Sequence, residues 1–476
     1  MSIYKTLGFV GRLRRRPESE SFFRLAKTAK QAMLVLSSMQ PDAARRKKGR
    51  SKPDRVFRHS LVAVIALAVG TASGVTTSDS PIRPGDRIAI IGNTFADQLR
   101  MHGYLETLLL QRSIQGRRGK AVSIRNLGWG GDMLTARDRP THFPSEESTL
   151  RAHQTDVLIA CFGMGESFAG PEGLADFCQD LEAFIASQRG KTYNGHSEVR
   201  LILVSPIAGE DLGNLTPGWK RRNRELAAYT EVMGEVAAEH QIPFVNLYDA
   251  ALCLLDDDTA PRFTRNGINP NSYGYWAMSR ALADGLVPGE APWRLRIDAR
   301  AKTADGWGVK ISSVEGDAGG LRFTVQEKNW PSLAPPTKGR VHDYLAGNRD
   351  TMVVEGLSPG DYLLTVDGEP VVAATHRKWA QGLAIDASPA HRSAEAYRQA
   401  VNDKNLQFTY SWKALNQVHI VGERKKSRSG QALPSEVIAF NRLAQRKDEA
   451  LRAGIRLETR EWRLIRNPDP FTEYRD

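Results

Sequence analysis

Between residues 85 and 290, short apolar runs alternate with longer amphipathic segments. The runs are rich in Val, Ile and Leu and have strand length, at 87–91, 121–127, 156–162, 199–205 and 243–247. The segments between them carry apolar residues at helical spacing, at 95–111, 173–188, 219–239 and 273–283. Apolar strands separated by helices indicate a parallel sheet that is covered on both faces. We therefore predict a three-layer α/β/α domain over residues 79–290, with its ligand crevice beyond the carboxyl ends of the strands.

The pattern changes after residue 290. Short strand-like runs at 321–326, 351–354 and 362–366 are separated by turn signals such as Asp367-Gly368. Turns at this spacing predict a small antiparallel β unit over residues 291–385. Helical spacing returns after residue 386, at 394–404 and 437–453, around a basic segment at 424–430 that we interpret as a solvated loop. Residues 386–476 are therefore predicted to form a helical C-terminal tail.

The N-terminal segment, residues 1–78, has the pattern of an export signal. Basic residues precede an apolar run at 61–70, and small residues follow it at 71–74. This order is typical of a secretory signal, and the run is shorter than the roughly 20 residues of a membrane span. We expect export to the periplasm or the medium. The alternatives are an uncleaved anchor at residues 60–75, which would be the only contact with a membrane, and a buried core helix.

The charge of +12 belongs to this N-terminal segment. Residues 1–60 hold 16 Lys and Arg and 4 Asp and Glu, which leaves 50 of each sign from the chain totals of 66 and 54. A neutral body argues against a nucleic-acid-binding domain. The three cysteines form no Cys-x-x-Cys pair, and no cluster has the spacing of metal ligands. No phosphate-binding or dinucleotide-binding glycine pattern is present. We therefore expect neither a metal nor a cofactor.

Four loops rich in Gly and Asn follow the predicted strands and open the last helix of the α/β region. Their sequences are Ile91-Gly-Asn-Thr94, Asn126-Leu-Gly-Trp-Gly-Gly-Asp132, Phe162-Gly-Met-Gly-Glu-Ser167 and Asn266-Gly-Ile-Asn269 with the residues that follow. In this order and on this framework, the loops resemble those of the SGNH, or GDSL-type, hydrolase family. The chain is also similar to the long exported SGNH proteins of planctomycete-type bacteria. The resemblance implies a flavodoxin-like sheet and a crevice shaped for an acyl or carbohydrate ester.

The family resemblance also assigns a role to each loop. A serine at the end of the first strand attacks the ester, a histidine accepts its proton, and an aspartate three residues earlier orients the histidine. The serine amide, a glycine amide and an asparagine side chain hold the oxyanion. In this chain, those positions are occupied by Thr94 (nucleophile), Asn269 (base), Asn266 (orienter), Gly131 (oxyanion glycine) and Gly165 (oxyanion asparagine). Only the glycine matches the family pattern, and neither amide can act as a general base near neutral pH.

Other crevice residues offer substitutes for the missing groups. Asp132 and Glu166 could act as bases if desolvated, although helix capping and hydrogen bonds to loop amides are the structural alternatives. His102 lies about 12 Å along the helix from Thr94, out of reach, and His142 follows the second strand. Trp129 is interpreted either as a platform for a sugar ring or as a lid over the core. Asn93 is a candidate for ligand binding or for tight-turn duty.

Two functions follow from this interpretation. In the first, the protein is an exported SGNH-like binding or scaffold module that has lost Ser-His-Asp ester hydrolysis and keeps a crevice for an acyl- or carbohydrate-ester ligand. In the second, it is an ester hydrolase that acts on short-chain acyl or carbohydrate esters with Thr94 and a non-standard base. A carboxylate or imidazole at the Thr94 hydroxyl would favour the enzyme.

Overall fold

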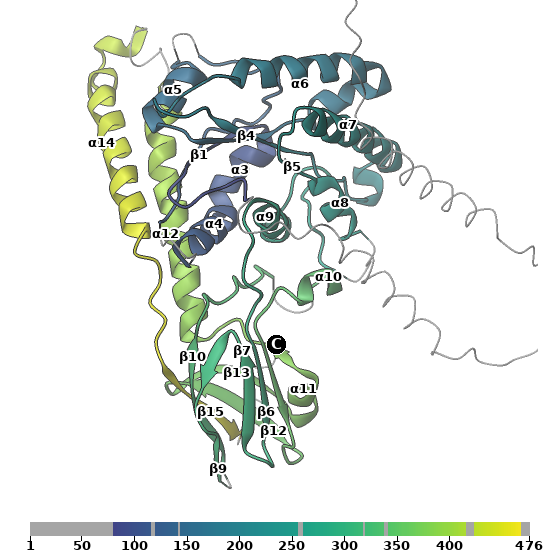
Figure 1. The fold of residues 1–476 in the computed structure, drawn as a ribbon, viewed down its shortest axis with the longest axis vertical. Coiled ribbons are helices and arrows are strands. Elements are labelled where there is room, and N and C mark those ends of the chain that lie inside the picture. The colour runs from purple at the N-terminus through teal and green to yellow at the C-terminus, as the bar shows by residue number, and fades with distance from the viewer. Residues whose placement is uncertain are drawn as a thin grey trace, which may run out of the picture. The chain divides into compact units, whose positions relative to one another are not determined.

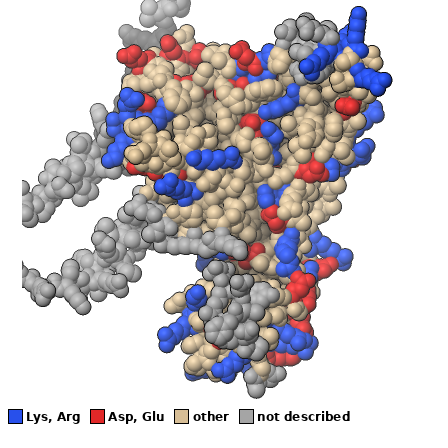
Figure 2. Space-filling view, turned by 180° about the vertical axis from the view of Figure 1, so that it is seen from behind, with Lys and Arg blue, Asp and Glu red and all other residues tan. Residues whose placement is uncertain are grey.

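The computed structural model describes residues 80–115, 120–140, 143–255, 260–317, 319–337, 341–415 and 423–467. All of them belong to the second of two units, Val75–Asp476. The predicted export signal and the alternative anchor at 60–75 lie outside the described residues. Within the described ranges, no helix is long and apolar enough to cross a membrane. The face drawn in Figure 2 carries basic and acidic side chains interspersed among larger uncharged areas.

A five-stranded parallel sheet forms the centre of the α/β domain (Figure 1). Its order is β2-β1-β3-β4-β5. Four strands lie within runs predicted from the sequence, and β1 extends one residue beyond its run, to Gly92. The bounds are β1 Arg87–Gly92, β2 Ser123–Asn126, β3 Val157–Cys161, β4 Arg200–Val204 and β5 Phe244–Val245. This is the flavodoxin-like order, so the predicted fold class is confirmed.

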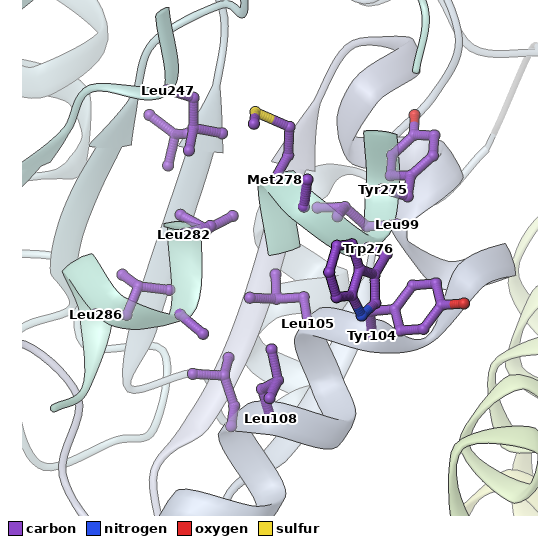
Figure 3. Packing of buried hydrophobic residues seen from close by; sticks show 14 of the residues in the cluster. Leu99, Tyr104, Leu105, Leu108, Leu247, Tyr275, Trp276, Met278, Leu282 and Leu286 are labelled. Carbon is purple, nitrogen blue, oxygen red and sulfur yellow. The ribbon is translucent and has the colours of Figure 1, made fainter. Parts of the chain in front are cut away.

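Helices cover both faces of the sheet because successive strand residues point to opposite sides. Ile88 and Ile90 of β1 belong to a core shared with α3, α4, α8 and α9, whereas Ala89 and Ile91 belong to a core shared with α5, α6 and α7. Figure 3 shows part of the first core, where Leu105 of α4 and Leu282 of α9 lie among other apolar side chains. The helices are α3 Thr94–His102, α4 Tyr104–Gln115, α5 Glu146–His153, α6 Leu174–Gln188, α7 Trp219–Glu239, α8 Leu247–Leu252 and α9 Ser272–Leu286, with 3₁₀ turns at Glu166–Gly173 and Gly213–Leu215.

The helix predicted over residues 95–111 is two helices. Gly103 ends α3 in a left-handed conformation with φ of +68°, and its amide donates to the carbonyl of Leu99. A Cβ at this position would lie 2.2 Å from Oδ1 of Asn402. The break is therefore fixed both by backbone conformation and by the close approach of a helix from the C-terminal part of the chain.

Two sheets form the β unit and share one apolar core that includes Trp293, Phe323 and Trp462. One sheet has the order β13-β12-β15-β10-β8, with β9 on β10, and the other has the order β14-β11-β6-β7. The second sheet is mixed, because β6 and β11 run parallel. The elements are β6 Arg294–Asp298, β7 Thr303–Trp307, β8 Val309–Ile311, β9 Glu315–Asp317, β10 Gly320–Glu327, α10 Asp343–Ala346, β11 Thr351–Glu355, β12 Asp361–Val366, β13 Glu369–Thr375, α11 His376–Gln381 and β14 Leu383–Ala384.

The C-terminal tail differs from the helical prediction in its last segment. Helices α12, Pro389–Trp412, and α14, Arg428–Leu451, lie side by side in Figure 1, after which β15, Arg460–Arg466, returns to the β unit between β10 and β12. A 3₁₀ turn, Glu423–Lys426, precedes α14 within the basic segment. Trp462 and Leu464 of β15 are fully buried, so the alternation of this last strand was a signal that the helical interpretation missed.

Glu327 at the end of β10 is expected to destabilise the β unit at neutral pH. The residue is 2% exposed, and neither carboxylate oxygen has a hydrogen-bond partner within the described ranges. Burial raises the pKa of this carboxyl above its ordinary value. A pKa that is higher in the folded than in the unfolded state means that folding favours the protonated form. Stability is therefore lost as the pH rises from the unfolded pKa through the folded one.

We expect Glu327→Gln to stabilise the protein at pH 7 by about 1–3 kcal/mol, because the amide has no charged form to bury. The gain should shrink below the unfolded pKa, where the native carboxyl is already protonated. Urea denaturation between pH 4 and pH 8 measures both effects. Glu461→Gln on neighbouring β15, whose carboxylate pairs with Arg322 at the surface, is the control and should show no such gain. Destabilisation of Glu327→Gln at pH 7 would contradict this account.

Candidate functional site

A pocket of about 290 Å³ lies beyond the carboxyl ends of the strands, where the parallel sheet predicts the ligand crevice. Six of the residues proposed from the sequence as site residues line it, namely Asn93, Thr94, Gly131, Asp132, Gly165 and Asn269. Trp129, Glu166 and Asn266 are not among its lining residues. The structure thus brings residues from all four Gly- and Asn-rich loops to one pocket, which we call the crevice.

Thr94 is the first residue of α3, and its hydroxyl forms no hydrogen bond with any described residue. The helix is capped instead by Asn93, whose Oδ1 accepts from the Phe95 amide at 3.0 Å. Thr94 therefore does not cap the helix, and its hydroxyl stays available. Because Thr94 opens the helix, its amide has no intrahelical acceptor and lies at the positive end of the helix dipole.

Asn269 lines the crevice, and its side-chain amide has no hydrogen-bond partner within the described ranges. Asn266 is exposed, and its Oδ1 accepts from the backbone amide of Asn269 at 2.9 Å. This contact is an Asx turn that shapes the loop. Asn266 therefore orients the backbone of Asn269 and not its side chain, unlike an aspartate that holds a catalytic imidazole.

Gly131 and Gly165, at the two oxyanion positions, have no side chain and can offer only backbone groups to a ligand. Gly131 has φ of +91°, and a Cβ there would meet no atom within 4 Å. Gly165 is crowded, since a Cβ would lie 2.6 Å from Cγ of Met133. A side chain at 165 therefore requires Met133 to move. The amide of Gly131 makes no backbone hydrogen bond with a described residue and can face a ligand oxygen.

Asp132 is held in an ion pair and is not a free base. Both of its oxygens accept from Arg139, at 2.8 and 2.7 Å, and the carboxylate is buried. The same Arg139 guanidinium lies 4.6 Å from the ring centre of Trp129. Trp129 in turn packs edge-on against Phe143 and Trp412, so the ring forms part of the core beside the loop. The position of Trp129 matches a lid over the core and not a platform for a sugar ring, because Trp129 does not line the crevice.

Glu166 and Ser167 tie the third loop together. The two Glu166 oxygens accept from the amides of Leu134 and Gly163, both at 2.8 Å. Burial raises the pKa of the Glu166 carboxyl, and these amides oppose the rise. Ser167 is fully buried and accepts a 2.6 Å hydrogen bond from Arg222. Both side chains are therefore occupied in holding the loop.

No imidazole is placed in the crevice by the described residues. His102 stacks on Tyr275 with ring centres 4.3 Å apart, and burial together with Arg265 and Arg398 lowers its pKa to about 4. His142 lies outside the described residues. Cys161 lines the crevice as a buried thiol, and burial raises its pKa to about 12. At neutral pH it is neither a thiolate nor a base.

The apolar wall of the crevice was not predicted from the sequence. It consists of Phe95, Met133, Phe162, Met164, Phe168, Pro206, Ile207 and Ile268. Phe168 is 64% exposed and lies beneath Arg222, whose guanidinium carbon is 3.7 Å from the ring centre. These residues come from five separate segments with no shared spacing. A ligand with an apolar group and one carbonyl or amide matches such a wall and its few polar atoms.

Comparisons with known proteins agree with this architecture. Residues 85–277 match the model of the GDSL-like Lipase/Acylhydrolase family. A gut microbial diltiazem-metabolizing enzyme has a similar structure, with a TM-score of 0.58 and 18% identity over 83% of this chain and 100% of that chain. An acetylxylan esterase from Geobacillus stearothermophilus has a TM-score of 0.34 and 18% identity over 44% of this chain and 97% of its own. No sequence among the curated proteins matches the chain.

The family match covers the sheet, the four loops and the beginning of α9, the last helix of the α/β domain. The structural similarity with a TM-score of 0.58 extends over the same fold. Residues 85–277 of this chain therefore match the GDSL-like Lipase/Acylhydrolase family.

Proposed function

We propose that the protein binds an acyl- or carbohydrate-ester ligand in the crevice and does not hydrolyse it by a Ser-His-Asp mechanism. The observation that carries the proposal is the set of titratable groups that line the crevice. Among the described residues these are Asp132, which is paired with Arg139, and Cys161, whose thiol is protonated. Neither can accept the proton of the Thr94 hydroxyl.

The groups that remain are suited to binding. The Thr94 hydroxyl, the Thr94 and Gly131 amides and the Asn269 carboxamide can hydrogen-bond the carbonyl and hydroxyl oxygens of an ester. The apolar wall accommodates the acyl group. An oxyanion site without a base and an activated nucleophile stabilises a bound carbonyl but leaves most of the barrier in place.

We expect no Thr94-dependent ester hydrolysis by the purified full chain. The rates with 4-nitrophenyl acetate, 4-nitrophenyl butyrate and acetylated xylose should agree within about twofold between the parent and Thr94→Ala, because the parent hydroxyl is not activated. Calorimetry should detect ligand binding in the parent and its loss in Ile268→Trp, which fills the crevice. Leu215→Trp, at a surface position that is 74% exposed and outside the crevice, is the matched control.

The active hydrolase is the outcome that would overturn the proposal. A parent that is faster than Thr94→Ala by more than about tenfold would mean that a base activates the hydroxyl. His142→Ala and Asp132→Asn would then identify that base. Absence of ligand binding in the parent would refute the binding role.

A further inference from the structure

Phe168 differs from the other apolar residues of the crevice because its side chain is exposed. It is 64% exposed, whereas the rest of the apolar wall is half-buried or buried. A ligand in the crevice can therefore reach the ring. Single exposed apolar side chains are common on protein surfaces, so exposure by itself assigns no role. The contacts of Phe168 provide the further evidence.

A largely buried arginine holds the ring in place. The guanidinium carbon of Arg222, on α7, lies 3.7 Å from the centre of the Phe168 ring, which places the guanidinium against one ring face. Arg222 is itself fixed by hydrogen bonds, because its Nη2 donates to the Met164 carbonyl at 2.9 Å and to the Ser167 hydroxyl at 2.6 Å. Its Nη1 pairs with Glu225 at 3.4 Å. The ring of Phe168 is therefore held in one orientation, although it is exposed.

The face of the ring that Arg222 leaves free belongs to the crevice wall. Phe168 lines the crevice, and Arg222 is not among the described residues that do so. The guanidinium therefore lies behind the ring as seen from the crevice, and the exposed area is on the opposite face and the edges. A cationic ligand on that face would be close to a fixed positive charge, which repels it. An uncharged group meets no such penalty.

The remainder of the crevice also suits a compact, uncharged ligand. Asp132, the charged residue among the described lining residues, is buried and paired with Arg139. Met133 and Met164 line the same crevice and are half-buried, and thioether sulfurs make favourable contacts with aromatic rings. A volume of about 290 Å³ holds about ten water molecules at roughly 30 Å³ each, which matches a ligand of about ten non-hydrogen atoms.

We propose that Phe168 is the specificity-determining residue of the crevice, that Arg222 positions it, and that the two select an ester with a flat, uncharged aromatic group. The proposal rests on ester binding in the crevice, which is the proposed function, and it names the class of ester. The aliphatic lining residues Ile207 and Ile268 bury apolar area of any ligand alike. Offset stacking on a fixed ring adds to this burial, and a saturated group of the same size does not gain it.

Four acetate esters with the same number of non-hydrogen atoms test the selectivity, namely phenyl acetate, cyclohexyl acetate, hexyl acetate and acetylcholine. Their dissociation constants with the full chain are measured by ligand-observed NMR titration. We expect phenyl acetate to bind about threefold to tenfold more tightly than cyclohexyl acetate and hexyl acetate, because its ring can stack on Phe168. Acetylcholine should bind most weakly. Ile268→Trp, which fills the crevice, should abolish the binding of phenyl acetate.

A pair of variants at Phe168 connects the preference to its ring. The readout is the ratio of the affinities for phenyl acetate and cyclohexyl acetate, which a general loss of folded protein does not change. Phe168→Leu should bring this ratio within about twofold of one, since the side chain stays apolar but cannot stack, whereas Phe168→Tyr should keep the ratio of the parent. Tyr410→Leu, at a position on α12 that is 47% exposed and outside the crevice, is the matched control.

Arg222→Met tests the support of the ring. The same ratio should fall by at least about twofold, because the ring loses the guanidinium that fixes its orientation. Arg221→Met, on the same helix, removes a side chain that is 79% exposed and outside the crevice, and it should leave the ratio unchanged. An unchanged ratio in Arg222→Met would refute the positioning role.

The remaining outcomes separate this proposal from the proposed function. Equal affinities of the parent for phenyl acetate and cyclohexyl acetate would overturn the selectivity, as would a preference that Phe168→Leu leaves unchanged. Tightest binding of acetylcholine would show that the ring binds a cation despite Arg222. If acetylated xylose binds in the crevice but none of the four esters does, ester binding stands and the aromatic selectivity is refuted. If no ester binds, both proposals are refuted.

Discussion

Lys404→Ala is expected to destabilise the protein by about 3–5 kcal/mol, because it leaves a buried carboxylate without its counter-charge. Lys404 of α12 is fully buried and forms an ion pair with Glu106 of α4. The second oxygen of Glu106 accepts from Asn405 at 2.8 Å. Burial raises the pKa of the Glu106 carboxyl, and Lys404 opposes that rise. The pair therefore secures the C-terminal helices to the α/β domain at a site that water does not reach.

The pH dependence of the loss provides a specific signature. Without Lys404, the folded-state pKa of Glu106 should rise further above its unfolded value. The deficit relative to the parent should then be largest at neutral pH and should shrink toward pH 4, where an unfolded-state glutamate is already about two-thirds protonated. Urea denaturation of parent and variant at pH 7 and pH 4 measures this difference, and contributions of other carboxylates cancel in the comparison.

Lys447→Ala supplies the matched control on the same helical pair. Lys447 pairs with Asp403, but the two side chains are 33% and 45% exposed. A partly exposed pair of this kind is worth at most about 1 kcal/mol. The double variant Lys404→Met, Glu106→Leu should recover much of the loss, because it removes both buried charges together. Equal losses for Lys404→Ala and Lys447→Ala would show that burial of the pair has no role in stability.

The contact between Lys404 and Glu106 also shows where prediction from sequence stops. Apolar periodicity located the five parallel strands and most helices, because burial on both faces of a sheet leaves a local pattern. It did not locate the pairing of α12 with the α/β domain, since a lysine in a helical pattern indicates an exposed position. Burial of this side chain depends on Glu106, 298 residues away in the sequence. Similarly, the alternation of β15 is visible in the sequence, but its place between β10 and β12 is not, because both partners lie in an earlier part of the chain.

The same distinction between local sequence patterns and contacts that depend on the fold applies to the crevice. The loops that line it were identified because glycine and asparagine mark tight turns at strand ends. The hydrogen bonds of Glu166 to loop amides are one of the alternatives that the sequence left open. The ion pair of Asp132 with Arg139 was not foreseeable, because it depends on the three-dimensional course of a loop. Those contacts decide the chemistry, since they occupy the two carboxylates that the sequence offers as substitute bases.

Restoring the family residues is expected to create ester hydrolysis in this crevice. The variant combines Thr94→Ser, Gly165→Asn, Asn266→Asp and Asn269→His. Thr94 and Asn269 already line one pocket, and Asn266 already contacts the backbone of Asn269, so the changes place a nucleophile, a base and an orienter on an existing frame. General-base catalysis alone contributes about 10²–10⁴-fold. We therefore expect 4-nitrophenyl acetate hydrolysis at least about 10²-fold above the parent.

The dependence of this gain on each residue tests the explanation. The triple variant that keeps Asn269 should lose nearly all of the gain, because nucleophile and base act as a unit. The full variant should become more active as the pH rises through about 6.5, where an ordinary histidine loses its proton.

A second triple variant, which keeps Gly165, tests whether an asparagine fits at this position. A Cβ at residue 165 would lie 2.6 Å from Cγ of Met133, so the asparagine requires Met133 to move. If this variant equals the full variant, the asparagine has not reached the oxyanion. If the full variant folds but gains no hydrolysis with this pH profile, the crevice differs from the family's active site in more than these four residues, and loss of the base would not account for the missing chemistry.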